Sequence, residues 1–110
     1  MKINIAKDYT ETTGGRYIKD GEYSGEDFRD NVLKHKYEIA AKKKEKLIIN
    51  FDGGYGYSSS FLEEAFGGLK RILRDEGKKI DINIFEFISD DQQGLIKIIK
   101  DYIKNAWWGR

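Results

Sequence analysis

The stretch of sequence that decides the fold is Leu47-Ile48-Ile49-Asn50-Phe51-Asp52. A nearly continuous apolar run of this length is typical of an interior strand that is covered on both faces. It is followed by the glycine-rich loop Gly53–Tyr57 and by the serine triplet Ser58–Ser60. We therefore expect a buried strand, a flexible loop and the start of a helix in immediate succession.

A helix is predicted on each side of this strand. The first is expected to begin at Ser24, because a serine can accept hydrogen bonds from the free N–H groups of a helix start. Its predicted apolar face consists of Phe28, Val32, His35 and Ile39.

The second helix is expected to begin at Ser60, which has capping-box spacing to Glu63. Gly77 is a suitable residue to end it. Its predicted apolar stripe consists of Leu62, Ala65, Phe66, Leu69, Ile72 and Leu73.

Further strands are predicted at Lys2–Ala6, Arg16–Lys19 and Lys79–Ile88, and a final helix is predicted to open at Asp90–Gln93. Alternating strands and helices favour parallel pairing with right-handed crossovers. If the strand Arg16–Lys19 pairs with the first strand, that pair is antiparallel. The prediction is a single α/β domain over residues 1–110, with a mixed four-stranded sheet and about three helices largely on one face. The first pair is antiparallel and the rest is parallel.

Composition excludes several classes of function. The chain has 110 residues without Cys and with one His, which excludes disulfides, thiolate catalysis and Cys-ligated metals. Lys and Arg total 20 against 19 Asp and Glu, so the net charge of +1 argues against nucleic-acid binding. No run approaches the roughly 20 apolar residues of a membrane span, and the N-terminus lacks the pattern of a secretory signal. We expect a cytoplasmic protein without metal or cofactor, which is not an enzyme.

The serine triplet beside the aromatic loop is the sharpest candidate site. A phosphate is stabilised at a helix start by free N–H groups and the helix dipole, so Ser59 and Ser60 are candidate phosphoacceptors. The competing interpretation is that these serines only cap the helix and keep the loop soluble. The predicted partner-binding surface consists of Tyr55, Tyr57, Ser58, Ser59, Phe61 and Glu63.

Three other interpretations stay open. The lysines between Lys34 and Lys46 could bind nucleic acid in an accessory or antitoxin-like protein, although a solvated helix end explains them as well. Asp52 and Glu63 could serve a small enzyme. Trp108 is a candidate contact for a partner or a second copy of the chain, because tryptophan is enriched in interface hot spots.

Four motifs carry a family resemblance. Arg16 and Asp20–Gly21 precede the motif Ser24-Gly25-Glu26-Asp27-Phe28-Arg29. Asp52 lies in the motif Ile49–Gly53, and the last motif is Ser60–Gly67. Together these motifs resemble the STAS-like domain family of unknown function.

The resemblance implies a relation to the STAS domains of bacterial anti-anti-sigma factors. Those domains are non-enzymatic modules that dock on a histidine-kinase-like ATPase, and phosphorylation of a serine at a helix start turns the docking off. The serine lies in an Asp-Ser-Ser-Gly motif, which aligns with Ser58–Phe61 and places the phosphoacceptor on Ser59. The Asp and the Gly of that motif correspond to Ser58 and Phe61. The expected function is a regulatory protein–protein interaction module in the bacterial cytoplasm.

Overall fold

The computed structural model describes residues 1–106. Residues 107–110 are outside the described part of the chain, and so is the predicted role of Trp108 at an interface.

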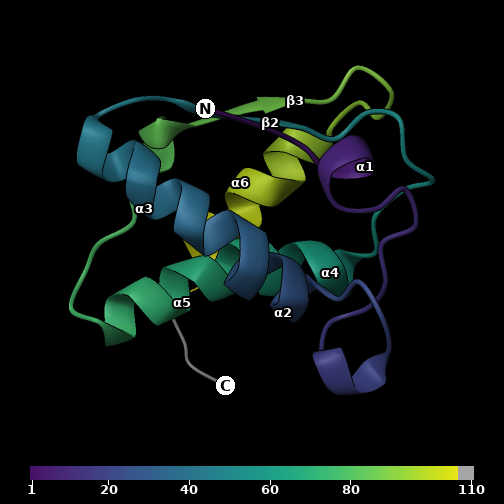
Figure 1. The fold of residues 1–110 in the computed structure, drawn as a ribbon, viewed down its shortest axis with the longest axis horizontal. Coiled ribbons are helices and arrows are strands. Elements are labelled where there is room, and N and C mark those ends of the chain that lie inside the picture. The colour runs from purple at the N-terminus through teal and green to yellow at the C-terminus, as the bar shows by residue number, and fades with distance from the viewer. Residues whose placement is uncertain (107–110) are drawn as a thin grey trace.

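Three strands form one parallel sheet in the order β1-β2-β3 (Figure 1). They are β1 (Lys2–Asn4), β2 (Leu47–Asn50) and β3 (Phe85–Ile88). Ile49 in the central strand pairs with Ile3 on one side and with Phe87 on the other. The alternating strand–helix order therefore gives parallel pairing, as predicted.

The predicted antiparallel first pair is wrong, because Arg16–Lys19 is not a strand. The backbone of this segment serves the start of the next helix instead: the carbonyl of Arg16 accepts the N–H of Glu26 at 3.0 Å. The Glu26 carboxylate in turn accepts the N–H of Ile18 at 2.9 Å. The chain then turns through the 3₁₀ helix η1 (Ile18–Asp20). Residues 1–106 thus contain three strands rather than four.

The predicted strand Lys79–Ile88 is also shorter than expected. The Asp81 side chain accepts the N–H of Asn83 at 3.0 Å. This side-chain bond favours a turn over an extended chain, and the 3₁₀ helix η4 (Ile82–Ile84) results. Only Phe85–Ile88 pairs with β2.

Two long helices are each built from three segments, and we call them the first and second composite helices. The first joins α2 (Gly25–Phe28), the π-helical η2 (Arg29–Leu33) and α3 (Lys34–Lys43). The second joins α4 (Ser59–Leu62), the π-helical η3 (Glu63–Gly67) and α5 (Gly68–Asp75). The short α1 (Ile5–Asp8) and the final α6 (Leu95–Asn105) complete the described helices. The backbone stays right-handed helical where the segments join.

The predicted apolar face of the first composite helix is correct at Phe28 and in part at Val32, which is half-buried and packs against the core, but it is wrong at His35. The buried residues are Phe28, Leu33, Tyr37 and Ala40. The π-helical segment η2 winds more residues per turn than an α-helix, which moves the buried face on by one residue. His35, placed on the apolar face by regular α-helical spacing, is exposed.

One end of each composite helix is determined by a residue close to it in sequence. Ser24 caps α2 as predicted, since its hydroxyl accepts the N–H of Asp27 at 3.0 Å. Gly77 follows the end of α5 with a φ of +76°, a left-handed conformation that favours glycine. The prediction for the end of the second helix is confirmed.

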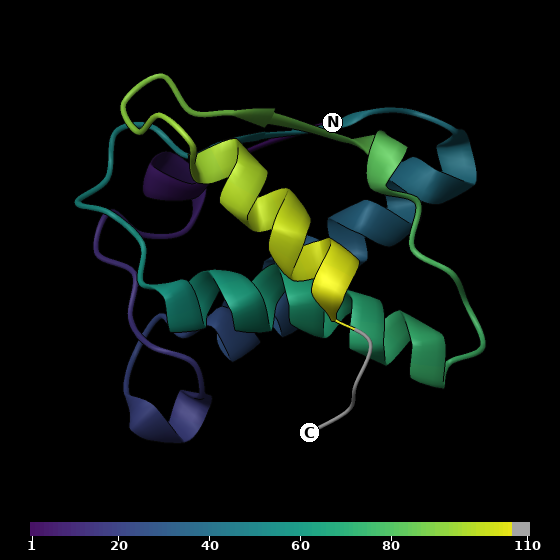
Figure 2. The same cartoon turned by 180° about the vertical axis from the view of Figure 1, so that it is seen from behind.

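Both composite helices and α6 lie on one face of the sheet (Figures 1 and 2). A strand order of 1-2-3 with right-handed crossovers sends each connection over the same face. Ile49 and Phe85 point into this layer and are buried, whereas Ile48 is partly exposed and Glu86 is exposed on the opposite face. The expectation that the Leu47–Asp52 strand is covered on both faces is therefore wrong.

None of the helices in residues 1–106 combines the length and the apolarity that crossing a bilayer requires.

Candidate functional site

The loop that follows β2 is fastened to an N-terminal loop. The N–H of Tyr55 donates to the carbonyl of Glu11 at 2.9 Å, and the hydroxyl of Thr13 donates to the carbonyl of Gly56 at 2.9 Å. A Cβ on Gly54 would lie 3.1 Å from the Glu11 carbonyl oxygen. The glycine therefore permits a close approach between two loops that lie more than 40 residues apart in sequence.

Ser58, and not Ser60, caps the second composite helix. The Ser58 hydroxyl accepts the N–H of Phe61 at 3.1 Å and donates to the carbonyl of Gly14 at 3.2 Å. The predicted cap at Ser60 is wrong, because the helix begins two residues earlier. Ser59 is the first residue of α4 and is exposed, while Ser60 is partly buried.

The aromatic residues of the predicted binding surface separate into exposed and buried ones. Tyr55 is 83% exposed, whereas Phe61 is fully buried. The Tyr57 hydroxyl donates to the carbonyl of Phe51 at 2.9 Å, and its ring packs edge-on against the Phe51 ring. Burial, with a smaller contribution from the nearby Asp52 charge, raises the pKa of Tyr57 to about 12. Tyr55 is therefore the one aromatic residue of this group that reaches well into solvent.

Asp52 holds the loop that follows β3. Its two carboxylate oxygens accept the N–H groups of Asp90 and Asp91, each at 2.9 Å. In return the Asp91 carboxylate accepts the N–H of Gly53 at 3.2 Å. Asp52 thus joins the carboxyl-end loops of two neighbouring strands.

Glu63 belongs to a network of ion pairs. Its carboxylate lies 2.6 Å from the guanidinium of Arg16 and 2.7 Å from that of Arg71. The neighbouring Glu64 also lies 3.1 Å from Arg16. Two arginines from different parts of the chain therefore neutralise Glu63.

Arg29 and Glu64 form the most buried pair of this network. The two side chains are 8% and 9% exposed, and their charged atoms lie 2.5 Å apart. Burial by itself would lower the pKa of Arg29, but the hydrogen bond and charge of Asp30 and the charge of Glu64 outweigh it and raise that pKa. A Cβ on Gly68 would lie 2.7 Å from Arg29 Nη1, so glycine leaves the space that the pair occupies.

Most of the family-motif residues fasten the first composite helix to its surroundings. A Cβ on Gly25 would lie 2.4 Å from the carbonyl oxygen of Phe61, so α2 and α4 meet backbone to backbone. Phe28 is fully buried and its ring lies 5.7 Å from that of Phe61. The two separate sequence motifs therefore form one structural junction.

Three residues of the ion-pair network have a role that the sequence analysis did not predict. They are Glu64, Gly68 and Arg71. Glu64 sits within the apolar stripe of its helix, directly before the buried Ala65. A charged residue within an apolar stripe is the signal that indicates a buried ion pair, because a buried charge without a partner is very costly. The sequence predicts Glu63 as a partner-binding or catalytic residue, but in the structure arginines pair with both Glu63 and Glu64.

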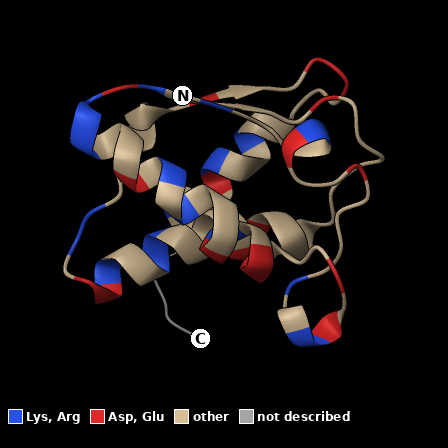
Figure 3. Ribbon diagram, viewed as in Figure 1, with Lys and Arg blue, Asp and Glu red and all other residues tan. Residues whose placement is uncertain are grey.

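The basic cluster Lys34–Lys46, whose lysines are among the residues drawn blue in Figure 3, has ion pairs or hydrogen bonds at both of its ends. Lys34 pairs with Glu38 at 3.4 Å and with Glu76 at 3.1 Å, and Lys46 donates to the carbonyl of Asn83 at 2.5 Å. The cluster is therefore partly neutralised. Residues 1–106 contain no group of three or more His, Cys, Asp or Glu side chains that could hold a metal ion.

Residues 24–92 match the sequence model of a family described as STAS-like domain of unknown function (DUF4325). The chain belongs to this family. The matched part of the STAS-like domain begins at the cap of α2 and ends in the loop after β3, so it contains both composite helices and the loop that carries Tyr55. No curated protein and no solved structure matches the chain.

Proposed function

We propose that this STAS-like domain is a non-enzymatic regulatory module that binds a partner protein through Tyr55, Ser58 and Ser59, which we call the docking edge. The observation that carries the proposal is the 83% exposure of Tyr55 on a loop whose backbone is bonded to Glu11. A tyrosine on a fastened loop offers a large contact area at little cost in conformational entropy.

The hydrogen bonds of Asp52 and the ion pairs of Glu63 support a non-enzymatic role. Asp52, the candidate catalytic residue after the central strand, uses both oxygens to hold backbone N–H groups. Glu63 is paired with two arginines. Neither is arranged as a general base, which needs an oxygen within hydrogen-bond reach of a substrate proton.

The partner class that we propose is a histidine-kinase-like ATPase in the bacterial cytoplasm. This choice rests on the resemblance to the STAS domains of anti-anti-sigma factors. The docking edge lies at the start of the second composite helix, after the central strand, which is the place that the resemblance assigns to docking.

Phosphorylation of Ser59 is proposed to control this binding. Of the three serines, Ser58 has a hydroxyl that is engaged on both sides, and Ser60 is partly buried. Ser59 is exposed in the first helical turn. A phosphate there would add about −1.5 to −2 charges to the docking edge, and the partner would meet a changed surface.

Affinity capture with matched variants tests the proposal. The unmodified chain is expected to recover an ATPase of this class from a bacterial lysate, as identified by mass spectrometry. Tyr55→Ala should lose it, because the truncation removes the most exposed large side chain of the docking edge. Ile98→Ala is the control, since Ile98 is 45% exposed on α6. Recovery by Tyr55→Ala equal to that of the unmodified chain would exclude the docking edge.

A further inference from the structure

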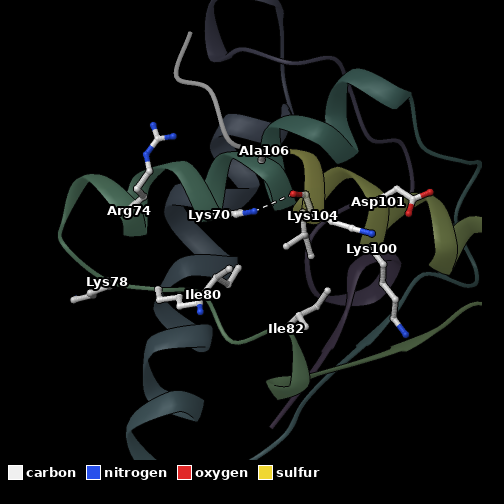
Figure 4. Close-up of a pocket in the computed structure, with 11 residues that line it drawn as sticks. Lys70, Arg74, Lys78, Ile80, Ile82, Lys100, Asp101, Lys104 and Ala106 are labelled. Carbon is white, nitrogen blue, oxygen red and sulfur yellow. Dashed lines mark hydrogen bonds between the residues drawn. The ribbon is translucent and has the colours of Figure 1, made fainter.

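A groove of about 720 Å³ lies between α5, α6 and the segment that leads into η4 (Figure 4). Ile80, Ile82, Ile103 and Ala106 supply its apolar lining. Its volume falls within the range of small-molecule sites, about 300–1,000 Å³. The docking edge contributes no residue to it.

The rim of the groove is strongly cationic. Among the lining residues within 1–106, six are cations and one, Asp101, is a carboxylate, in a chain whose net charge is only +1. The cations are Lys70, Arg74, Lys78, Lys79, Lys100 and Lys104. The near-neutral composition thus conceals one surface with a large local excess of positive charge.

Several of these cations lack a nearby carboxylate. Lys78 is paired with Glu38 and Glu76. Among residues 1–106, by contrast, no carboxylate lies within ion-pair distance of Lys79, Lys100 or Lys104. An anion in the groove would meet side chains that do not have to leave an existing ion pair.

Like charges are crowded at one wall of the groove. Lys70 reaches across to α6, where its ammonium donates to the carbonyl of Lys104 at 3.1 Å (Figure 4). Burial, with a smaller contribution from the charge of Arg74, lowers the pKa of Lys70. A bound anion would reduce this repulsion between positive charges.

We propose that the groove binds a small amphipathic organic anion. Its apolar body would lie on Ile80, Ile82 and Ile103. Its carboxylate, phosphate or sulfonate group would lie among the rim lysines. Neither feature suffices alone, because exposed lysines hold a simple anion weakly in water and at physiological salt.

Titration with 8-anilinonaphthalene-1-sulfonate, an apolar fluorophore that carries one sulfonate, tests the proposal on the full chain. We expect saturable binding of one molecule per chain. N-Phenyl-1-naphthylamine, which lacks the sulfonate, and inorganic phosphate, which lacks the apolar body, should each bind at least tenfold more weakly. Equal affinity for the neutral analogue, or the absence of saturable binding, would overturn the proposal.

Charge-reversal variants locate the site. The double variant Lys100→Glu with Lys104→Glu should weaken binding of the sulfonate at least tenfold. The control, Lys7→Glu with Lys42→Glu, makes the same change in net charge at exposed lysines outside the groove and should leave the affinity within twofold. Equal weakening by both variants would indicate non-specific attraction and refute the groove. Sedimentation that shows a dimer dissociated by Ile82→Asp would refute it too, because a second copy would then cover the site.

Discussion

The contact between Arg29 and Glu64 shows how single residues join the two composite helices. Each lies in a π-helical segment, and each is almost fully buried. A buried ion pair gains little over an apolar pair of the same shape, but removal of one partner leaves an uncompensated charge. We therefore infer that this pair fixes how the two composite helices are placed against each other. Its net contribution to the free energy of unfolding is small.

Glu64→Ala is expected to lower the free energy of unfolding by about 1–3 kcal/mol, because Arg29 would lose its buried partner and keep only the more exposed Asp30 as counter-charge. Arg29→Ala should cost a similar amount. The double variant should cost clearly less than the two single variants together, as measured by urea unfolding.

Asp75→Ala serves as the control for these variants. Asp75 pairs with Arg74 at 3.4 Å, and its side chain is 71% exposed. Loss of such a surface pair costs about 1 kcal/mol or less. Strict additivity of Arg29→Ala and Glu64→Ala would contradict the assigned role of the buried pair.

Gly25 is a residue at which the backbones of the two composite helices approach each other closely. Gly25→Ala is expected to destabilise the chain by about 1–3 kcal/mol or more, because its Cβ would overlap the carbonyl of Phe61. Gly15→Ala is the matched control, since a Cβ there meets no atom within 4 Å. Thermal unfolding of both variants measures the difference, and equal melting temperatures would refute the close approach.

At the scale of elements, the π-helical segment η2 decides which side of the first composite helix is buried. Leu33→Ala is expected to cost about 2–5 kcal/mol, because Leu33 is fully buried. His35→Ala should change stability by less than about 0.5 kcal/mol, because His35 is exposed. Regular α-helical spacing from Phe28 predicts the opposite order, so denaturant unfolding of the two variants distinguishes the two registers.

The sequence correctly predicts those features of the helices that neighbouring residues determine. The cap at Ser24 and the end at Gly77 depend on neighbouring residues, and both predictions are confirmed. The buried residues of α6 also follow simple helical spacing from Leu95 to Ile103.

The strand Lys79–Ile88 is shortened by the local bond between Asp81 and Asn83, but other predictions fail where distant parts of the chain decide the structure. Arg16–Lys19 has the composition of a short strand, but its backbone bonds to the start of α2. Ser58 rather than Ser60 caps the second composite helix, and its hydroxyl also bonds to Gly14. For the candidate site, the glycine-rich sequence indicates an exposed loop at Tyr55, while the burial of Phe61 follows only from packing against Phe28.

At the scale of the whole molecule, one face of the sheet carries both composite helices and α6, and two surfaces have different proposed roles. The docking edge lies where the central strand passes into the second composite helix, and the cationic groove lies between α5 and α6. The net charge of +1 is small enough that one phosphate on Ser59 would reverse its sign.

The affinity of the captured partner for Ser59 variants tests the central claim most directly. By calorimetry, Ser59→Asp should bind at least tenfold more weakly than the unmodified chain, a difference of about 1.4 kcal/mol. Ser59→Ala should bind like the unmodified chain. Asn105→Asp, which adds the same charge at an exposed position at the end of α6, should do so as well. Binding of Ser59→Asp as tight as that of the unmodified chain would contradict regulation by charge at the docking edge.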